Sequence, residues 1–361
     1  MKIIVNATAL DSGGGLTILN QFLENAQKNI KNEYIVFVSG SLAFEESPNI
    51  KYVKVNNRSW LQRIHWDWCG LKAFLKKYNY QYNKVICLQN TSLNVDVEQI
   101  IYLHQSIPLT DFSFNLFDKE QFKLFLYKHF YPFFIFRFAN NNSKFIVQTK
   151  WMKEALIKKF KIQEQNITII KPDVLNVKGI HLQDPVSEVP TLLYPATPYF
   201  YKNHEVLLKA FKRLKAYGEL NNLVLQVTFS LGDCPVFDNA VKAYGLISNI
   251  DYLGVLPQDK LISMYVQCHA VVFPSYIETF GLPLSEAASL GKKVLCADLP
   301  YSRDVLEKYD GALFIDPFNE LDWAEQILRI KALKLNECKF SFKPDVRLDL
   351  GWSDFFTIIN E

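Results

Sequence analysis

Two carboxylates, Glu278 and Glu286, stand on either side of Gly281 with seven residues between them. The apolar run 270–273 just upstream predicts a buried strand, and a helix is expected to begin near Pro283. A loop that carries a glycine and opens a helix presents unpaired backbone N–H groups to an anion. Carboxylates beside it can accept hydrogen bonds from hydroxyls. The stretch therefore suits a phosphate flanked by hydroxyls, which is the chemistry of a nucleotide-sugar.

The elements that must position these groups alternate along the chain. Short apolar runs that predict strands alternate with helical patterns, first in the N-terminal half and again in the C-terminal half. Such alternation predicts βαβ units and parallel sheets. We expect one domain over 1–178, a second over 190–340 and a terminal helix over 341–361, with the polar stretch 177–190 as the linker. Ligands of such sheets bind beyond the carboxyl ends of the strands, so the expected site is the cleft between the domains.

Further candidates lie where predicted strands end. The turn Gly13–Gly15 follows the first strand and opens a helix, so its backbone can approach a ligand closely; a plain strand-to-helix turn is the alternative. Thr197 and Lys202 follow the first strand of the second domain, and lysine is a compact cation that can meet a diphosphate. His104 follows another strand of the first domain, where a role in the cleft competes with that of an ordinary structural histidine.

Composition narrows the class of protein. The chain has 361 residues, enough for two cores, and 49% of them are apolar. Its formal net charge of +3 is too small to indicate a nucleic-acid partner. The six cysteines are scattered without a C-x-x-C pair, which favours reduced thiols in the cytoplasm over disulfides or a zinc site. The N-terminus lacks the apolar stretch of a signal peptide, and no run approaches the roughly 18 apolar residues of a membrane-spanning helix.

A basic and aromatic segment covers 119–137. Pro132 is expected to kink the helix or end it soon afterwards. One interpretation of the segment is a helix packed on the core. The other is a surface in peripheral contact with an anionic membrane or a lipid-linked acceptor. Four apolar side chains recur there at helical spacing and form one stripe: Phe122, Phe125, Leu126 and Phe130.

Together these residues resemble the glycosyltransferases of family 4, also called glycosyltransferases group 1, which have the GT-B fold. The likeness covers the whole chain in layout and is most specific over 252–291, where Glu278 and Glu286 match the family's E-x7-E signature. It implies an α/β protein of two Rossmann-like, doubly wound domains facing a cleft, with a C-terminal helix that crosses back to the first domain.

The resemblance also implies roles for individual residues. Glu286 would hold the ribose hydroxyls of the donor nucleotide, and Glu278 would contact the donor sugar near the reacting centre. Lys202 would bind the diphosphate, and His104 would lie near the anomeric carbon. The remaining residues of the donor site would be Thr197, Phe280, Gly281, Leu282, Gly14 and Gly15.

Two departures from the family pattern bear on this site. The arginine that commonly precedes the lysine is absent from the region Pro195–Thr197. Neutralisation of the diphosphate would then rest on Lys202 and helix N-termini, with Arg303 as a conjectured substitute. The usual Asn-Gly after the last strand of the first domain is replaced by Lys171–Asp173.

The resemblance implies a retaining transfer through a front-face, oxocarbenium-like state, and the chain offers no clear covalent nucleophile. A cation and oriented N–H groups can stabilise a leaving diphosphate, so we expect neither a metal nor a cofactor besides the donor, a UDP- or GDP-sugar.

The first hypothesis is a hexosyltransferase that extends a bacterial surface polysaccharide, O-antigen or capsule, on a lipid-linked glycan. It would work in the cytoplasm, peripherally on the inner face of the plasma membrane. The alternatives are transfer to a soluble small-molecule acceptor and a non-catalytic nucleotide-sugar-binding protein.

Overall fold

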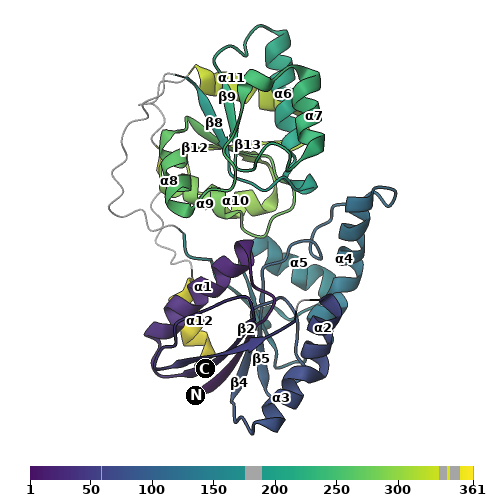
Figure 1. The fold of residues 1–361 in the computed structure, drawn as a ribbon, viewed down its shortest axis with the longest axis vertical. Helices are drawn as coiled ribbons and strands as arrows, with labels where there is room; N and C mark the ends of the chain where they lie inside the picture. The colour runs from purple at the N-terminus through teal and green to yellow at the C-terminus, as the bar shows by residue number, and fades with distance from the viewer. Residues whose placement is uncertain (58, 175–188, 333–339, 342–349, 361) are drawn as a thin grey trace. The chain divides into compact units, whose positions relative to one another are not determined.

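A computed structural model describes residues 1–361 except 58, 175–188, 333–339, 342–349 and 361. The chain divides into two compact units, which can be followed by colour in Figure 1. Unit 1 comprises Met1–Asp173 and Arg347–Glu361, and unit 2 comprises Val174–Val346. Most of the predicted linker 177–190 lies outside the described residues.

A seven-stranded parallel sheet forms the centre of unit 1. Its central strands are apolar and buried on both faces, as a parallel sheet covered by helices requires. The strand order reverses between the strands that come first and fourth in the chain, β1 and β4, and the carboxyl ends of these two strands therefore form the switch point of the sheet. From one edge to the other the strands are β3 (Ile50–Val55), β2 (Glu33–Ser39), β1 (Lys2–Ala7), β4 (Lys84–Cys87), β5 (Glu98–Leu103), β6 (Lys144–Val147) and β7 (Ile167–Ile169).

Helices connect the strands of unit 1. One of them, α2, begins at a capping box: the Ser59 hydroxyl accepts from the N–H of Gln62, and the Gln62 side chain accepts from the N–H of Ser59. The connecting helices are α1 (Gly13–Lys28), α2 (Trp60–His65), the π-helical turn η1 (Trp66–Gly70), α3 (Leu71–Lys77), α4 (Lys119–Phe136), α5 (Lys150–Phe160) and the 3₁₀ turn η2 (Glu164–Asn166).

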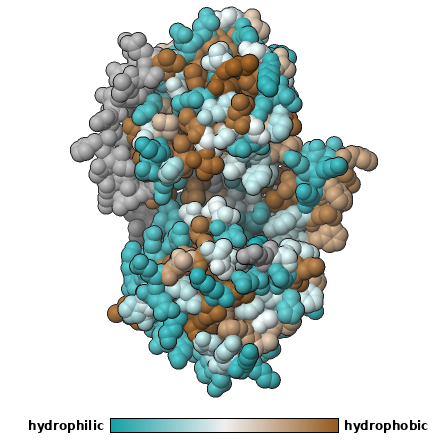
Figure 2. Space-filling model, viewed as in Figure 1, coloured by the Kyte–Doolittle hydropathy of each residue, from teal (hydrophilic) through white to brown (hydrophobic). Residues whose placement is uncertain are grey.

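The basic and aromatic segment forms α4. The helix begins after Asp118, whose carboxylate accepts from two backbone N–H groups, and it ends at Phe136, four residues past Pro132. The predicted apolar stripe is largely in solvent, because Phe122 is 43% exposed and Phe130 is 61% exposed. The last turns of the helix do pack on the core of unit 1, through Tyr131, Ile135 and Phe136, so the helix packs on the core while the stripe itself faces solvent. In Figure 2 the region over α4 carries both hydrophobic and hydrophilic residues.

The last described helix, α12 (Trp352–Ile359), completes the core of unit 1. It lies beside α1, as Figure 1 shows in yellow and purple. The ring of Trp352 stacks on Tyr102 of β5 with centroids 5.4 Å apart, and its Nε1 donates to Gln21 Oε1 at 2.9 Å. Phe356 packs against Phe22 of α1 at 5.5 Å between centroids. The helix therefore returns to the first unit, in agreement with the predicted fold class.

A six-stranded parallel sheet forms the centre of unit 2. The strand order again reverses between the strands that come first and fourth in the chain of this unit, β8 and β11, so their carboxyl ends form a second switch point. From one edge to the other the strands are β10 (Ile250–Tyr252), β9 (Val224–Val227), β8 (Thr191–Tyr194), β11 (Ala270–Phe273), β12 (Lys293–Ala297) and β13 (Ala312–Ile315). The connections are η3 (Phe200–Lys202), α6 (His204–Ala216), α7 (Pro235–Tyr244), η4 (Ile247–Asn249), α8 (Gln258–Gln267), α9 (Leu282–Ser289), α10 (Pro300–Leu306) and α11 (Glu320–Lys331).

The predicted fold class is confirmed: each unit is a doubly wound parallel sheet with helical connections. The five cysteines in the described part of the chain are free thiols, and Cys338 lies outside it. Among the described residues, no helix combines the length and apolar character needed to cross a bilayer.

Candidate active site

Lys202 and Glu278 meet at the switch point of unit 2. Lys202 ends η3, in the loop after β8, and Glu278 lies in the loop after β11, the strand that pairs with β8. The ammonium of Lys202 binds Oε1 of Glu278, and the two side chains are only 15% and 13% exposed. A charge-assisted hydrogen bond in such a setting is strong, so the two loops hold each other in place. The pair also leaves part of each charged group accessible to a ligand.

Neighbouring groups orient this ion pair. The hydroxyl of Ser275 donates to Oε1 of Glu278 at 2.7 Å, and the N–H of Tyr276 donates to the carbonyl of Tyr201 at 3.0 Å. The Nζ of Lys202 lies 5.4 Å from the ring centroid of Phe273, within the range of a cation–π contact. Each charge is therefore fixed by contacts from its own loop and from the neighbouring one.

Gly281 opens α9 in a conformation that favours glycine. Its φ is +77°, and a Cβ at this position would lie 3.3 Å from Leu284 Cδ1 and 3.4 Å from Tyr301 Cε2. The amide of Leu284 donates to the carbonyl of Gly281, and Pro283 has no N–H. The amides of Gly281 and Leu282 are therefore the first that this end of the helix can offer to an anion, as predicted for the loop.

Phe280 and Thr197 take different positions around this loop. Phe280 is 3% exposed, so its ring is part of the core and only its backbone can take part in binding. Thr197 is exposed after β8, and its carbonyl accepts from the N–H of Tyr199 at 2.9 Å. The conjecture that Arg303 supplements the lysine finds no support, because its guanidinium forms two hydrogen bonds with Asp298, at 2.6 and 2.7 Å.

Glu286 lies in the second turn of α9. The hydroxyl of Tyr265, from α8, donates to its Oε2 at 2.7 Å, and the Tyr265 ring is completely buried. Burial raises the pKa of the Glu286 carboxyl, and the hydrogen bond from Tyr265 opposes that rise. Glu286 is therefore a half-buried acceptor with one neutral donor already in place.

His104 lies at the carboxyl end of β5 in unit 1. Its Nε2 is 2.8 Å from the carbonyl of Leu88, which can only accept, so Nε2 carries a proton and donates. Its backbone N–H donates to Asn90 Oδ1 at 2.6 Å. Burial lowers the pKa of the imidazole to about 4, so the ring is neutral near pH 7 and its lone pair is on Nδ1. A neutral acceptor of this kind can take a hydrogen bond from a hydroxyl.

The glycine turn of unit 1 packs beside this histidine. A Cβ on Gly15 would lie 3.1 Å from Leu10 Cδ2 and 3.7 Å from His104 Cε1, whereas a Cβ on Gly14 would meet no atom within 4 Å. Gly13 has a φ of +55°, and α1 starts there. A side chain at Gly15 would therefore press on Leu10 and reach only ordinary contact distance from His104, and Gly14 borders open space at the helix N-terminus.

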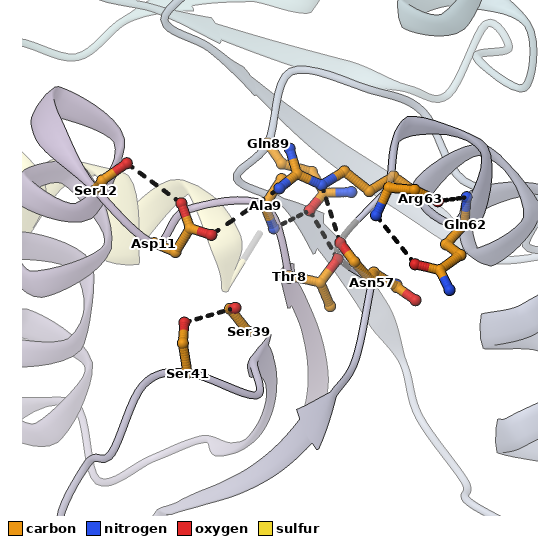
Figure 3. A network of polar contacts seen from close by, with 11 residues as sticks. Thr8, Ala9, Asp11, Ser12, Ser39, Ser41, Asn57, Gln62, Arg63 and Gln89 are labelled. Carbon is orange, nitrogen blue, oxygen red and sulfur yellow. Dashed lines mark hydrogen bonds and ion pairs between the residues drawn. The ribbon is translucent and has the colours of Figure 1, made fainter.

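Sequence reasoning missed a buried polar network behind this turn. The carboxylate of Asp67, in η1, accepts from Asn6 Nδ2 and Gln89 Nε2 at 3.1 Å each and from the Thr91 hydroxyl at 2.8 Å. Burial is the main cause that raises the pKa of Asp67, to about 7. Gln89 in turn accepts from the N–H of Ala9, and Figure 3 shows these two residues together. The network therefore anchors the loop that leads to the glycine turn.

Arg63 extends the polar surface of unit 1. Its Nε donates to the carbonyl of Asn57 at 3.2 Å, and its Nη2 lies 4.0 Å from Asp11 Oδ2 (Figure 3). Neither Arg63 nor Asp67 was a candidate, because both stand in a stretch whose apolar spacing predicts only a helix. The signal that could have indicated Asp67 was a charged residue between two tryptophans, Trp66 and Trp68.

Within the described ranges, no group of three or more His, Cys, Asp or Glu side chains is arranged to hold a metal ion. The prediction of a metal-free reaction stays a prediction, and it depends on what Lys202 and the amides of the α9 loop can do.

Comparison with known proteins adds a family and several relatives. Residues 183–340 match the family model "Glycosyl transferases group 1". The O-antigen chain mannosyltransferase RfbU of Salmonella typhimurium is 22% identical over 273 residues, which are 74% of this chain and 69% of that protein. The sucrose-phosphate synthase of Spinacia oleracea is 28% identical over 159 residues, which are 40% of this chain but only 15% of that protein.

Solved structures share the fold. WaaG, a glycosyltransferase involved in lipopolysaccharide biosynthesis, superposes with a TM-score of 0.68 at 14% identity, covering 92% of this chain and 91% of that one. At this level of identity the likeness concerns the fold alone.

Proposed function

Because residues 183–340 of this glycosyltransferase belong to the glycosyl transferases group 1, we propose that the chain moves a hexose from a nucleotide-diphosphate sugar to a glycan acceptor. The transfer retains the anomeric configuration and uses no metal. The observation that carries the proposal is the Lys202–Glu278 pair at the switch point of unit 2, beside the glycine-opened helix α9. These parts bring together a cation, a carboxylate and backbone donors, which a sugar diphosphate requires.

The reaction breaks the bond between the anomeric carbon and the diphosphate oxygen, which leaves with the electron pair. Lys202 and the amides of Gly281 and Leu282 stabilise the negative charge that develops on the departing diphosphate. Glu278 accepts hydrogen bonds from the sugar hydroxyls and holds the anomeric carbon in place. The acceptor hydroxyl attacks on the same face and gives its proton to the departing diphosphate, so the chain needs no separate covalent nucleophile.

The donor is a UDP- or GDP-sugar, and mannose is the first hexose to test. RfbU, the relative that aligns over 74% of the chain, is described as an O-antigen chain mannosyltransferase. That description favours a glycan acceptor in a bacterial surface polysaccharide. It also favours mannose over the other hexoses.

The acceptor glycan is carried on a lipid, and the enzyme works in the cytoplasm on the inner face of the membrane. Two observations support this part. The exposed stripe of α4 continues onto α2, because Trp60, itself 56% exposed, packs on Phe134 at 5.2 Å between centroids. Arg137 lies at the end of the same helix, with its guanidinium 5.9 Å from the centroid of Phe133. An apolar surface edged by cations suits an anionic bilayer.

A soluble acceptor is the second candidate, since the chain is similar to the sucrose-phosphate synthase of Spinacia oleracea over part of its length. In that case the α4 surface would have no role in catalysis. Flotation with anionic liposomes, with neutral liposomes as the control, distinguishes the two. The lipid-linked acceptor predicts binding that Phe130→Ser weakens and that high salt reduces. Absence of binding to either kind of liposome, with or without acceptor lipid, would exclude it.

Donor chemistry is tested by a panel of UDP- and GDP-hexoses. Thermal unfolding identifies the nucleotide-sugar that stabilises the protein, and release of the nucleoside diphosphate then measures turnover. We expect Lys202→Ala to lower turnover by a factor of ~100 or more. The control Lys209→Ala removes a lysine that pairs with Glu205 on the surface of α6 and leaves turnover unchanged. Unchanged turnover in Lys202→Ala would overturn the assignment of the diphosphate to this residue.

A further inference from the structure

Tyr265 and Glu286 form a hydrogen-bonded pair that joins the helix before β11 in the chain to the helix after it. The phenol is on α8 and the carboxylate is on α9. The hydroxyl donates to Oε2 at 2.7 Å, which is a charge-assisted bond when the carboxylate is ionised. The Tyr265 ring is completely buried, so it cannot itself reach a ligand in solvent. Any effect on a ligand must therefore pass through Glu286.

The bond uses only part of what the carboxylate can accept. An ionised carboxylate offers about four acceptor positions on its two oxygens. Within the part of the chain that the structure describes, Tyr265 is the one residue recorded as donating to Glu286. Oε1 and the second lone pair of Oε2 therefore stay open on the half-buried side chain, and they suit two neighbouring hydroxyls.

We propose that Tyr265 is a positioning residue that holds Glu286 so that it reads both hydroxyls of a ribose, and that the pair thereby selects ribonucleotides over deoxyribonucleotides. The inference rests on the proposed function and on the role that the family resemblance implies for Glu286, which is to bind the ribose of the donor. A carboxylate fixed by a buried phenol cannot turn to a different partner. If one sugar hydroxyl is missing, an acceptor in a partly buried site is left unpaired, which disfavours the deoxy ligand.

The charge of Glu286 is the second contribution of Tyr265. Burial raises the pKa of this carboxyl, and the phenol lowers it again by hydrogen bonding to the charged form. A protonated carboxyl would have to donate from one oxygen and could no longer accept from both hydroxyls. Removal of the Tyr265 hydroxyl therefore weakens nucleotide binding first at acidic pH, where more of the carboxyl becomes protonated.

Calorimetric titration of the full chain with UDP, GDP and their 2′-deoxy forms tests the proposal. We expect the protein to bind the better ribonucleotide about 10 to 100 times more tightly than its deoxy form. Tyr265→Phe keeps the buried ring and removes one oxygen, and the ratio should fall to about 1 to 3. The matched control is Tyr309→Phe, which removes a hydroxyl that donates to the Lys292 carbonyl elsewhere in unit 2 and should leave the ratio unchanged.

A double-mutant cycle separates positioning from packing. If Tyr265 acts through Glu286, then Tyr265→Phe has no further effect on the ribose preference in a Glu286→Gln background. In the Tyr265→Phe protein with Glu286 intact, the loss of nucleotide binding at acidic pH should also begin at a higher pH than in the unmodified protein. Additive losses, or a Tyr265→Phe protein with the original preference and pH profile, would overturn the inference.

The test also keeps the two proposals apart. If the unmodified protein binds none of the nucleotides, the donor assignment fails. If it binds ribonucleotides and deoxyribonucleotides equally, the ribose role of Glu286 fails and the positioning role of Tyr265 fails with it. If it prefers ribonucleotides and that preference survives Tyr265→Phe, only the inference about Tyr265 fails.

Discussion

Lys202 and Glu278 are ion-paired, although they lie 76 positions apart in the chain. The cation that we assign to the diphosphate is thus bound to the carboxylate that we assign to the sugar. A diphosphate competes with Glu278 for the ammonium of Lys202, and each hydrogen bond that it takes over frees an acceptor position on Glu278 for a sugar hydroxyl. Binding of one half of the donor therefore prepares the site for the other half.

The first prediction concerns Glu278→Gln, which removes the charge and keeps the size. We expect the affinity for UDP or GDP without a sugar to rise by a factor of ~3 to 10, because Lys202 no longer has to leave a carboxylate. Sugar transfer should fall by a factor of ~100. Calorimetry and turnover measure the two effects. The control is Glu205→Gln, which breaks a surface pair with Lys209. Weaker binding of UDP or GDP by Glu278→Gln would contradict the prediction.

The second prediction concerns Gly281→Ala. At a φ of +77° an alanine costs roughly 1–2 kcal/mol, which lowers Tm by a few degrees. Gly218→Ala matches it in backbone conformation, since its φ is +74°, but its Cβ would meet no atom within 4 Å. We expect Gly218→Ala to lose the backbone part of this stability in thermal unfolding, Gly281→Ala to lose slightly more, and only Gly281→Ala to lose nucleotide affinity. Equal affinities in the two variants would mean that the α9 loop does not hold the diphosphate.

The third prediction concerns the pH dependence of stability at Asp67. Its pKa is about 7 in the folded protein and about 3.8 in the unfolded chain, so between these values the folded state holds a proton that the unfolded state has lost. Its contribution to the free energy of unfolding is therefore greatest below pH 4. It falls by something on the order of 4 kcal/mol as the pH rises through 7.

Asp67→Asn cannot ionise and should escape this loss. We expect denaturant unfolding to show a more stable protein than the original at pH 8 and little difference at pH 4. Asp96→Asn, at an exposed carboxylate paired with Lys72, serves as the control. A variant that is less stable at pH 8 would show that the carboxylate is favourably bound. A gain in stability together with a loss of turnover would mark the network as retained for function.

The fourth prediction concerns the protonation of His104. With a pKa of about 4, the ring is neutral from pH 5.5 to 8, and Nε2 carries the proton. Nitrogen chemical shifts of the labelled imidazole distinguish the two tautomers. Turnover should therefore show no acid limb from this residue near pH 6. Leu88 accepts through its backbone, so a Leu88→Val control should leave the tautomer unchanged. A proton found on Nδ1 at pH 7.5 would rule out His104 as a hydroxyl acceptor.

Much of the fold could be predicted from the sequence because strand and helix patterns are local. The buried runs at β1, β8 and β11 alternate with helical periods, and two such series require two parallel sheets. The position of Lys202 and Glu278 at strand ends could be predicted for the same reason. Their mutual ion pair could not, since nothing local in either loop indicates its partner.

The residues that were missed share one property: their neighbours in sequence suggest another role. Tyr265 stands in an amphipathic helix and resembles any buried aromatic residue, so its hydroxyl gave no signal. Asp67 follows the same pattern in η1. For α4, the spacing of Phe122 and Phe130 predicted an apolar face correctly but could not show that the face is exposed. Burial depends on what a helix packs against, and that is decided by tertiary structure.

The place of α12 has a consequence for synthesis. Unit 1 closes its core with residues that leave the ribosome only after the whole of unit 2 has been made, since Trp352 packs on Tyr102 and Phe22. Domains usually fold in order as they emerge, at about 5–20 residues per second. From the end of β7 at Ile169 to Trp352, the N-terminal sheet must wait roughly 9 to 37 seconds at such rates with an apolar surface uncovered. The last unit to be translated is therefore free to fold first, and the enzyme becomes vulnerable to aggregation and to chaperone capture at its N-terminal half.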